Sequence, residues 1–273
     1  MLDKLEERHS DPRASHIRVT LGGAASNWVE LVPELARRYR LLVPDLPGHA
    51  GSAPLPVAPN VNAFADRIGL LADREGMLPA ALAGHSAGGL VALRLALRRP
   101  DAVRGIVLAA SAGISTGRRA ARVGLELLGL ARPSALISPF RRQIVRYAPL
   151  RYAAFGWWGA ADPPAMSARA VEGFLAGAAL HTDTLGLGRA LVADDLRPDL
   201  RDVSCPCLVL WGAGDHWVFL EDGFELARRL RASVRVIPDC GHLLIGERPD
   251  ACLDAIRSFL DSVQANSQPK TRR

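Results

Sequence analysis

Short apolar runs alternate with amphipathic segments along most of this chain. Residues 80–83, 105–110, 207–211 and 234–238 are short and mainly apolar, as the buried strands of parallel sheets are. Residues 90–97 and 221–230 instead repeat their apolar positions at helical spacing. Because strands that alternate with helices favour parallel pairing, the pattern predicts an α/β fold with a mostly parallel, doubly wound sheet.

The alternation stops over residues 113–203, which we expect to form a helical cap inserted into the sheet domain. Proline-containing breaks at Pro133, Pro149 and Asp162-Pro-Pro164 separate the expected helices of this cap, which cover 118–130, 139–146, 167–180 and 183–193. The α/β core then comprises residues 1–112 and 204–263. Residues 264–273 are polar and charged, and we expect a disordered tail there.

A serine lies between two glycines where the 80–83 strand passes into the 90–97 helix. In the sequence Gly84-His-Ser86-Ala-Gly88 the central residue is forced into a strained turn, and neither glycine carries a Cβ atom that would clash. The helix N-terminus adds N–H donors and a partial positive charge, so the Ala87 N–H is a candidate oxyanion donor. The pattern predicts that Ser86 is a nucleophile.

A nucleophilic serine needs a histidine base and a carboxylate that orients this base. Asp215 follows the 207–211 strand through a glycine-rich turn, and His242 follows the 234–238 strand. The carboxyl ends of parallel strands meet at one edge of the sheet, so we expect Ser86, Asp215 and His242 to meet there. Asp239 is a rival acid, but it approaches the same loop as His242 and would be hard to orient productively.

These spaced motifs resemble the α/β-hydrolase superfamily, specifically its capped serine hydrolases with a Gly-His-Ser-x-Gly elbow. The resemblance extends from Gly22 to about Val263 and includes Trp28, the 41–52 segment and the Glu247-Arg-Pro249 sequence that opens the last helix. It implies that Ser86 is the nucleophile, His242 the general base and Asp215 its orienting acid.

The chain departs from this family at its amino-terminal end. Members reach the first oxyanion loop through two or three strands and a His-Gly pair, whereas Val19-Thr20 stands in place of that pair here. We therefore expect the N-terminal strands to be abbreviated, with residues 1–15 poorly ordered or forming a short first strand. The second oxyanion donor is expected at the backbone N–H of Leu21 or Gly22, in a displaced position that slows turnover.

The cap is expected to shape the substrate pocket. Trp157 and Trp158, with Phe155 and Phe174, are candidates for its walls, although aromatic residues in a small helical lid also form its own core. His85, beside the nucleophile, is expected to line the pocket or to pack, because the role of the base belongs to His242.

Arginine supplies nearly all of the positive charge. Of the 34 basic residues 32 are arginine, the net charge is +6, and residues 118–151 contain eight arginines against one acid, Glu126. We expect these side chains to lie mainly on solvated helix faces, with attraction of anionic substrates as the alternative and a membrane surface as a less expected partner. No nucleic-acid partner is expected, because the segment lacks a recognised binding fold.

The rest of the composition bears on the size of the core, the location of the protein and the state of its cysteines. With 49% hydrophobic residues over 273 positions, the chain can bury one sizeable core. We expect a cytoplasmic protein, since no apolar signal core or long uncharged apolar run occurs. The cysteines Cys205, Cys207, Cys240 and Cys252 are expected to be free thiols, and the spacing of residues suggests neither a metal nor a cofactor.

We therefore expect a serine hydrolase that acts on small-molecule, carboxylic ester-like acyl substrates through an acyl-enzyme intermediate. Two alternatives stay open. One is carbon–carbon bond hydrolysis or perhydrolysis with the same three residues, and the other is a non-catalytic binding protein on the hydrolase scaffold.

Overall fold

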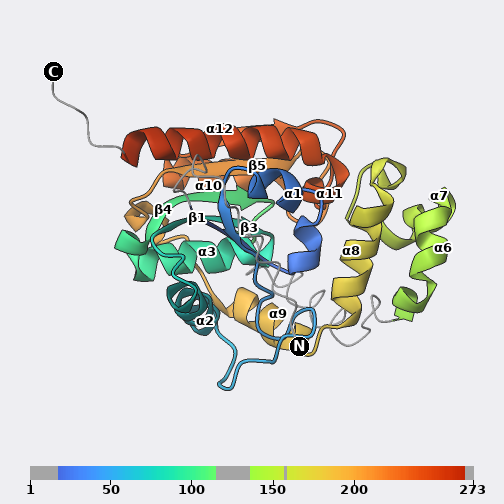
Figure 1. Cartoon of the computed structure of the whole chain (residues 1–273), viewed down its shortest axis with the longest axis horizontal. Coiled ribbons are helices and arrows are strands. Elements are labelled where there is room, and N and C mark those ends of the chain that lie inside the picture. The colour runs from blue at the N-terminus through green and yellow to red at the C-terminus, as the bar shows by residue number, and fades with distance from the viewer. Residues whose placement is uncertain (1–17, 115–135, 157–158, 268–273) are drawn as a thin grey trace.

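The computed structural model describes residues 18–114, 136–156 and 159–267. Six described strands form one parallel sheet in the order β2-β1-β3-β4-β5-β6 (Figure 1). They are β1 (Arg18–Gly22), β2 (Arg40–Leu42), β3 (Ala80–His85), β4 (Val103–Ala109), β5 (Cys207–Gly212) and β6 (Ser233–Ile237). The predicted α/β fold with a parallel sheet is confirmed, and the four strands expected from the sequence correspond to β3, β4, β5 and β6.

Helices cover both faces of the sheet (Figure 1). On one face, α12 (Pro249–Ser267) contacts β4, β5 and α1 (Val32–Ala36). On the other, α3 (Ala87–Arg98) contacts β1, β3 and β4, and α2 (Val61–Arg74) packs against α3. Two further helices lie between β5 and α12 in the chain. They are α10 (Leu220–Leu230), which packs on β5 and β6, and the short α11 (Leu244–Glu247), which precedes α12.

The central strands are apolar because helices enclose them. All residues of β3 and of β5 are buried, so neither strand has a polar face and neither shows alternating polar and apolar positions. The edge strand β6 is exposed over its first three residues. Since the strands are parallel, the carboxyl ends of β3, β5 and β6 lie along the same edge of the sheet.

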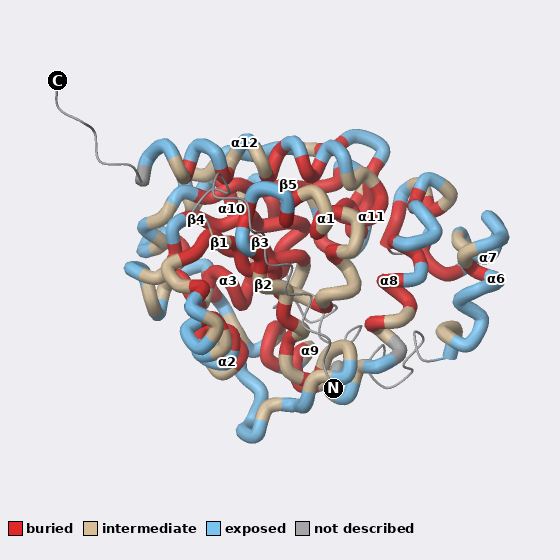
Figure 2. The backbone as a smooth tube through the Cα atoms, viewed as in Figure 1, coloured by how far each residue is buried: buried red, intermediate tan, exposed pale blue. Residues whose placement is uncertain are grey.

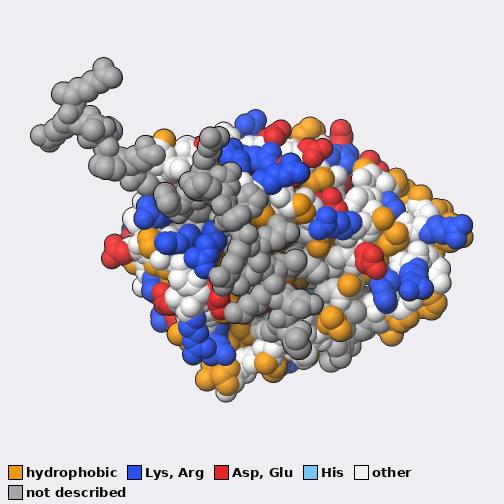
Figure 3. Space-filling view, viewed as in Figure 1, with side chains coloured by type: hydrophobic (Ala, Val, Ile, Leu, Met, Phe, Trp, Pro, Cys, Tyr) orange, Lys and Arg blue, Asp and Glu red, His pale blue; other side chains and the backbone are white. Residues whose placement is uncertain are grey.

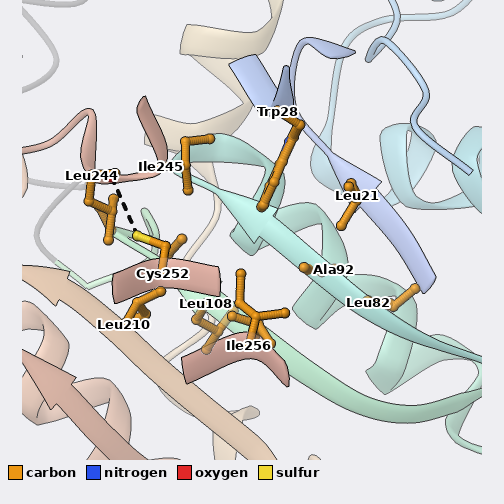
Figure 4. Packing of buried hydrophobic residues seen from close by; sticks show 14 of the residues in the cluster. Leu21, Trp28, Leu82, Ala92, Leu108, Leu210, Leu244, Ile245, Cys252 and Ile256 are labelled. Atoms are coloured by element: carbon orange, nitrogen blue, oxygen red, sulfur yellow. Dashed lines mark hydrogen bonds between the residues drawn. The ribbon is translucent and has the colours of Figure 1, made fainter. Parts of the chain in front are cut away.

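The main core lies between the sheet and its helices, where Figure 2 shows the buried backbone concentrated. Leu108 of β4 and Leu210 of β5 face Ile256 and Cys252 of α12 (Figure 4). All four side chains are fully excluded from solvent. Burying a leucine or isoleucine side chain contributes about 1.5–3 kcal/mol, so this layer is a large part of what holds α12 on the sheet.

The chain between β4 and β5 leaves the α/β alternation, as expected. Its described helices are α6 (Arg141–Arg146), α7 (Ala148–Arg151), α8 (Ala168–Ala179) and α9 (Thr184–Ala193). The insertion rests on the sheet domain through α9, which contacts α2 and α3, and through α8, which contacts residues 25–28 and α11. The helices α6 and α7 lie beyond α8 at the far end (Figure 1). The helices expected over 139–146, 167–180 and 183–193 correspond to α6, α8 and α9, and the one over 118–130 lies outside the described residues.

One local prediction was confirmed and one was wrong. The helical pattern is interrupted at the expected break, since α6 ends at Arg146, Tyr147 is extended and Pro149 lies in the first turn of the next helix, α7. The predicted tail begins too early, since α12 continues to Ser267 and residues 264–267 are helical. Intrahelical hydrogen bonds extend a helix already started by its buried face, even where the added residues are polar. Residues 268–273 lie outside the described part.

The cysteines agree with a further expectation. All four cysteines are free thiols; Cys205 is half-buried and the other three are buried. Throughout the described ranges, every helix is too short or too polar to span a lipid bilayer.

We expect Ile256→Ala to lower the free energy of unfolding by about 2–5 kcal/mol, because it leaves a cavity between α12 and the sheet. The control is Ser258→Ala on the exposed side of the same helix, with an expected change within about 0.5 kcal/mol. Urea unfolding followed by circular dichroism measures both variants. Equal effects of the two substitutions would contradict the packing described for α12.

Candidate active site

Ser86 lies in a strained turn between β3 and α3. Its backbone has φ 53° and ψ −118°, a conformation that residues with side chains rarely adopt. The Ser86 N–H donates to the Ala109 carbonyl at 2.9 Å, and the Ser86 carbonyl accepts from the Ala112 N–H at 3.1 Å. The end of β4 and the residues that follow it therefore fix the turn on both sides.

Two glycines allow three backbones to meet at this turn. A Cβ atom on Gly84 would lie 2.3 Å from the carbonyl of Gly88, where α3 begins. A Cβ atom on Gly88 would lie 2.5 Å from the carbonyl oxygen of Gly22, the last residue of β1. The elbow thus requires glycine at both positions because of close backbone approach, and it brings the end of β1 beside Ser86.

His242 connects Ser86 with Asp215. The His242 Nδ1 atom lies 2.9 Å from Asp215 Oδ2, and its Nε2 atom lies 3.1 Å from Ser86 Oγ. The side chains of His242 and Asp215 are 4% and 0% exposed, so water competes little for these contacts. With the Nδ1–H donating to Asp215, the Nε2 lone pair faces the Ser86 hydroxyl and is placed to accept its proton.

The turn after β5 orients Asp215. Its Oδ1 atom accepts the backbone N–H groups of Trp217 and Val218, both at 2.9 Å, which leaves Oδ2 for His242. The rival acid Asp239 is exposed and lies in the turn after β6 with φ 48°. The structure therefore brings Asp215, and not Asp239, to the imidazole.

His85 supports the backbone of His242. Its buried Nε2 atom lies 2.8 Å from the His242 carbonyl oxygen, to which it donates when Nε2 carries the proton. Burial, with a smaller effect of His242, lowers the pKa of His85 to about 3, so this ring stays neutral near pH 7. The ring also meets Phe174 of α8 edge-on. Of the two roles expected for His85, these contacts favour packing over lining a pocket.

The end of β1 differs from the expectation drawn from the sequence. Val19 and Thr20 lie inside β1, and the strand continues through Leu21 and Gly22, which are registered against Ala83 and Gly84 of β3. Val19-Thr20 therefore does not occupy the position just before the loop, which belongs to Gly22-Gly23. The prediction was wrong because it was based on the missing His-Gly pair and not on the register of the strand.

The loop after β1 is held from the neighbouring segment. Gly23 turns the chain with φ 135°, and its carbonyl accepts the Leu46 N–H at 3.0 Å. The Ala25 N–H donates to Asp45 Oδ1 at 2.7 Å. Burial raises the pKa of Asp45, and the hydrogen bond from Ala25 partly offsets this effect. Asp45 and Leu46 thus fix both ends of the turn at Gly23 and Ala24, next to the elbow.

The match to a known protein family covers most of the chain. Residues 19–255 match the model of the alpha/beta hydrolase family. The chain belongs to this family. It is accordingly an enzyme, a hydrolase of the α/β fold, and the non-catalytic alternative is set aside.

Two relatives are similar to this chain in sequence over most of their length. A pimeloyl-[acyl-carrier protein] methyl ester esterase from Aromatoleum aromaticum is 34% identical over 233 residues, which are 82% of this chain and 89% of that protein. A 2-hydroxymuconate semialdehyde hydrolase from Pseudomonas sp. strain CF600 is 31% identical over 258 residues, covering 89% and 83% of the two chains.

A third relative is matched over a smaller part of its own length, whereas a solved structure is matched over most of its chain. The dihydrolipoyllysine-residue acetyltransferase component of an acetoin cleaving system from Pseudomonas putida is 29% identical over 88% of this chain, but the match spans only 61% of that protein. The crystal structure of a hydrolase from Pseudomonas aeruginosa has a TM-score of 0.68 and 26% identity, covering 92% of each chain.

The helical insertion packs against the sheet domain close to His85. Phe174 and Phe155 are both buried, and a Cβ atom on Gly246 would lie 2.6 Å from the Phe174 ring. Phe174 therefore packs between His85 and α11. Trp157 and Trp158, the predicted pocket walls, lie outside the described residues.

Part of the basic charge of the insertion is exposed and part is structural. Arg141, Arg142 and Arg146 are exposed on α6, and Figure 3 shows basic and hydrophobic side chains together at that end of the hydrolase. Arg151, in contrast, donates to the carbonyl groups of Pro164 and Met166 at 3.1 and 2.7 Å.

Within the ranges described, no cluster of three or more His, Cys, Asp or Glu side chains is arranged to hold a metal ion.

We expect Gly88→Ala to lower the free energy of unfolding by about 1–3 kcal/mol or more, because the new methyl group must displace the carbonyl of Gly22. Gly22→Ala is the matched control on the other side of the same contact, since its Cβ atom would lie at an ordinary 3.6 Å from the Gly88 oxygen. A stability loss below about 1 kcal/mol is expected there. Thermal unfolding compares the pair, and equal tolerance of both substitutions would refute the close approach.

Proposed function

We propose that this hydrolase cleaves small carboxylic ester-like substrates through an acyl-enzyme intermediate on Ser86. The observation that carries the proposal is the continuous chain from Asp215 to His242 to Ser86, with contacts of 2.9 and 3.1 Å. The backbone strain at Ser86 supports it, because such strain is typical of a nucleophile held above a sheet edge. The ester-hydrolysing relative from Aromatoleum aromaticum is consistent with this substrate class.

In the first half of the proposed reaction, Ser86 Oγ attacks the ester carbonyl carbon while His242 Nε2 takes the hydroxyl proton. The tetrahedral intermediate collapses as the imidazolium returns this proton to the leaving alkoxide. An alcohol departs and the acyl group stays on Ser86. Asp215 remains ionised and stabilises the imidazolium through Nδ1–H.

In the second half, a water molecule attacks the acyl carbonyl carbon and gives a proton to His242. Collapse of the second intermediate returns the proton to Ser86 Oγ and releases the carboxylic acid. The same imidazole thus serves as base and then as acid in each half-reaction.

Two backbone N–H groups form the proposed oxyanion hole. One is the N–H of Ala87, in the first turn of α3, where helix N–H groups lack intrahelical acceptors. Leu21 and Gly22 belong to the sheet, so we assign the second donor to the turn beyond them, at the Ala24 N–H. The contacts of Asp45 and Leu46 with this turn support the assignment, since they fix its position before substrate binds.

Carbon–carbon bond hydrolysis is the second candidate, because one relative is a 2-hydroxymuconate semialdehyde hydrolase. Perhydrolysis with the same residues also stays an alternative. Both alternatives use Ser86 and His242. Carbon–carbon hydrolysis differs from ester hydrolysis in the bond cleaved, and perhydrolysis differs in using hydrogen peroxide in place of water, so neither differs in the residues tested below. A panel of p-nitrophenyl esters with short and medium acyl chains, compared with a vinylogous 1,5-diketone, separates the first two activities.

A fluorophosphonate probe is expected to label this hydrolase once, at Ser86, because only an activated serine reacts readily with it. Ser86→Ala should abolish labelling, whereas Ser258→Ala on the surface of α12 should leave it unchanged. Intact-mass spectrometry measures the stoichiometry. A folded wild-type protein that takes up no probe would overturn the proposed function.

Asp215→Asn is expected to lower kcat on the order of 1000-fold or more while the fold is kept, because an amide favours the wrong imidazole tautomer. Asp239→Asn should change kcat by less than about threefold, since this carboxylate is exposed and the imidazole contacts Asp215 instead. Steady-state ester hydrolysis checks the pair. The reverse ranking would assign the acid to Asp239.

A further inference from the structure

A short segment of the insertion lies on the loop that carries His242. We call residues 159–162 the strap. The Leu243 N–H donates to the Gly159 carbonyl at 2.8 Å, so the residue after the base is hydrogen-bonded to the strap. Arg248 also reaches Asp162 Oδ2 at 3.5 Å. These contacts join segments that are far apart in the chain.

A buried carboxylate closes the same junction. Glu247, which is 2% exposed, accepts the Asp162 N–H on Oε1 at 2.7 Å and the Gly241 N–H on Oε2 at 2.8 Å. One oxygen therefore holds the strap, and the other holds the residue just before His242. Burial raises the pKa of Glu247, and hydrogen bonds from the Gly241, Asp162 and Ala161 backbone oppose that rise.

Close packing accompanies these hydrogen bonds. A Cβ atom on Gly241 would lie 2.8 Å from both the Ala161 nitrogen and the Gly159 oxygen, so the strap runs directly over this backbone. A Cβ atom on Gly214, next to Asp215, would lie at an ordinary 3.4 Å from Ala161. The strap thus touches the loop that bears the base and lies near the loop that bears the acid.

The other side of the base loop is held from the sheet. His85 contacts the His242 carbonyl oxygen, as described above, whereas Glu247 and Gly159 hold residues 241 and 243. The backbone on each side of His242 is therefore fixed by polar groups, and two of these three supports lead to the insertion.

We propose that Glu247 is a positioning residue through which the seating of the strap sets the position of His242. The proposal rests on the proposed function, because it assigns His242 the role of base. A shift of about 1 Å in a catalytic group lowers the rate on the order of 100-fold, so loosening the strap reduces turnover although Glu247 touches no reacting atom.

The direct test is Glu247→Gln, which keeps the shape of the side chain but turns an NH₂ group toward a backbone N–H. We expect kcat to fall on the order of 100-fold with KM changed by less than about threefold. Deuterium exchange should rise in peptides covering 159–166 and 240–247 and stay unchanged in β3. Exchange that rises without any loss of kcat would reduce Glu247 to a purely structural residue and overturn the proposal.

A second pair of variants tests the strap without altering charge. Gly241→Ala places a methyl group against the strap backbone and should reproduce both effects of Glu247→Gln, whereas Gly214→Ala makes only ordinary contacts and should match wild type. If Glu247→Gln fails to fold, this pair decides. Equal kcat values for Gly241→Ala, Gly214→Ala and wild type would refute the coupling.

The role of Glu247 and the proposed function can be rejected independently of each other. Fluorophosphonate labelling of the wild-type protein reports on Ser86 alone, and its failure would reject the hydrolytic mechanism whatever the strap does. A wild-type protein that is labelled and turns over esters, with variants that keep full kcat, would instead reject only the role of Glu247.

Discussion

The Ser86 hydroxyl reaches His242 because the backbones of β3 and α3 meet at Gly84 and Gly88 with no side chain between them. A methyl group on Gly84 would separate β3 from α3, and one on Gly88 would separate α3 from the end of β1, so either would relax the turn that holds Ser86 at φ 53°. The end of β1 depends on the same contact, since Gly22 packs against Gly88. Nucleophile, helix N-terminus and oxyanion loop are therefore assembled by one close approach of main chain.

Backbone N–H groups also stabilise the buried carboxylates around this contact. Asp215 and Glu247 are buried carboxylates, and each accepts at least two backbone N–H groups, at 2.7–2.9 Å. Such donors compensate part of the lost hydration. His85 carries no buried charge near pH 7, because burial lowers its pKa to about 3. The site thus keeps one imidazole, that of His242, placed between a carboxylate and a hydroxyl.

Much of this arrangement could be predicted from the sequence because its signals are local. The glycines around Ser86 and the strand ends before Asp215 and His242 follow from close approach and parallel pairing, which apolar runs and turn residues reveal. The role of Glu247 could not be predicted in this way, because backbone N–H groups are identical at every residue and leave no pattern in the sequence. Glu247 was noted in the sequence only as part of the Glu247-Arg-Pro249 resemblance, shortly after the apolar Leu-Leu-Ile run, and neither feature names its hydrogen-bond partners.

The errors had a similar cause. Val19-Thr20 was placed at the mouth of the loop from a missing motif, whereas pairing with β3 carries the strand on to Gly22. Residues 264–267 were assigned to the tail because they are polar, although the helix α12 continues through them to Ser267. In both cases the decisive information was the register of hydrogen bonds along the backbone, which side-chain composition reflects only weakly.

The central claim, that Ser86 forms an acyl-enzyme, is tested most directly by rapid quench of the hydrolase with p-nitrophenyl acetate. Intact-mass spectrometry followed by peptide mapping locates any transferred group. The account predicts an acetyl group on Ser86 that forms with the burst of p-nitrophenol and decays at the rate of turnover. Ester turnover in which Ser86 never carries an acetyl group, and which persists in Ser86→Ala, would contradict it.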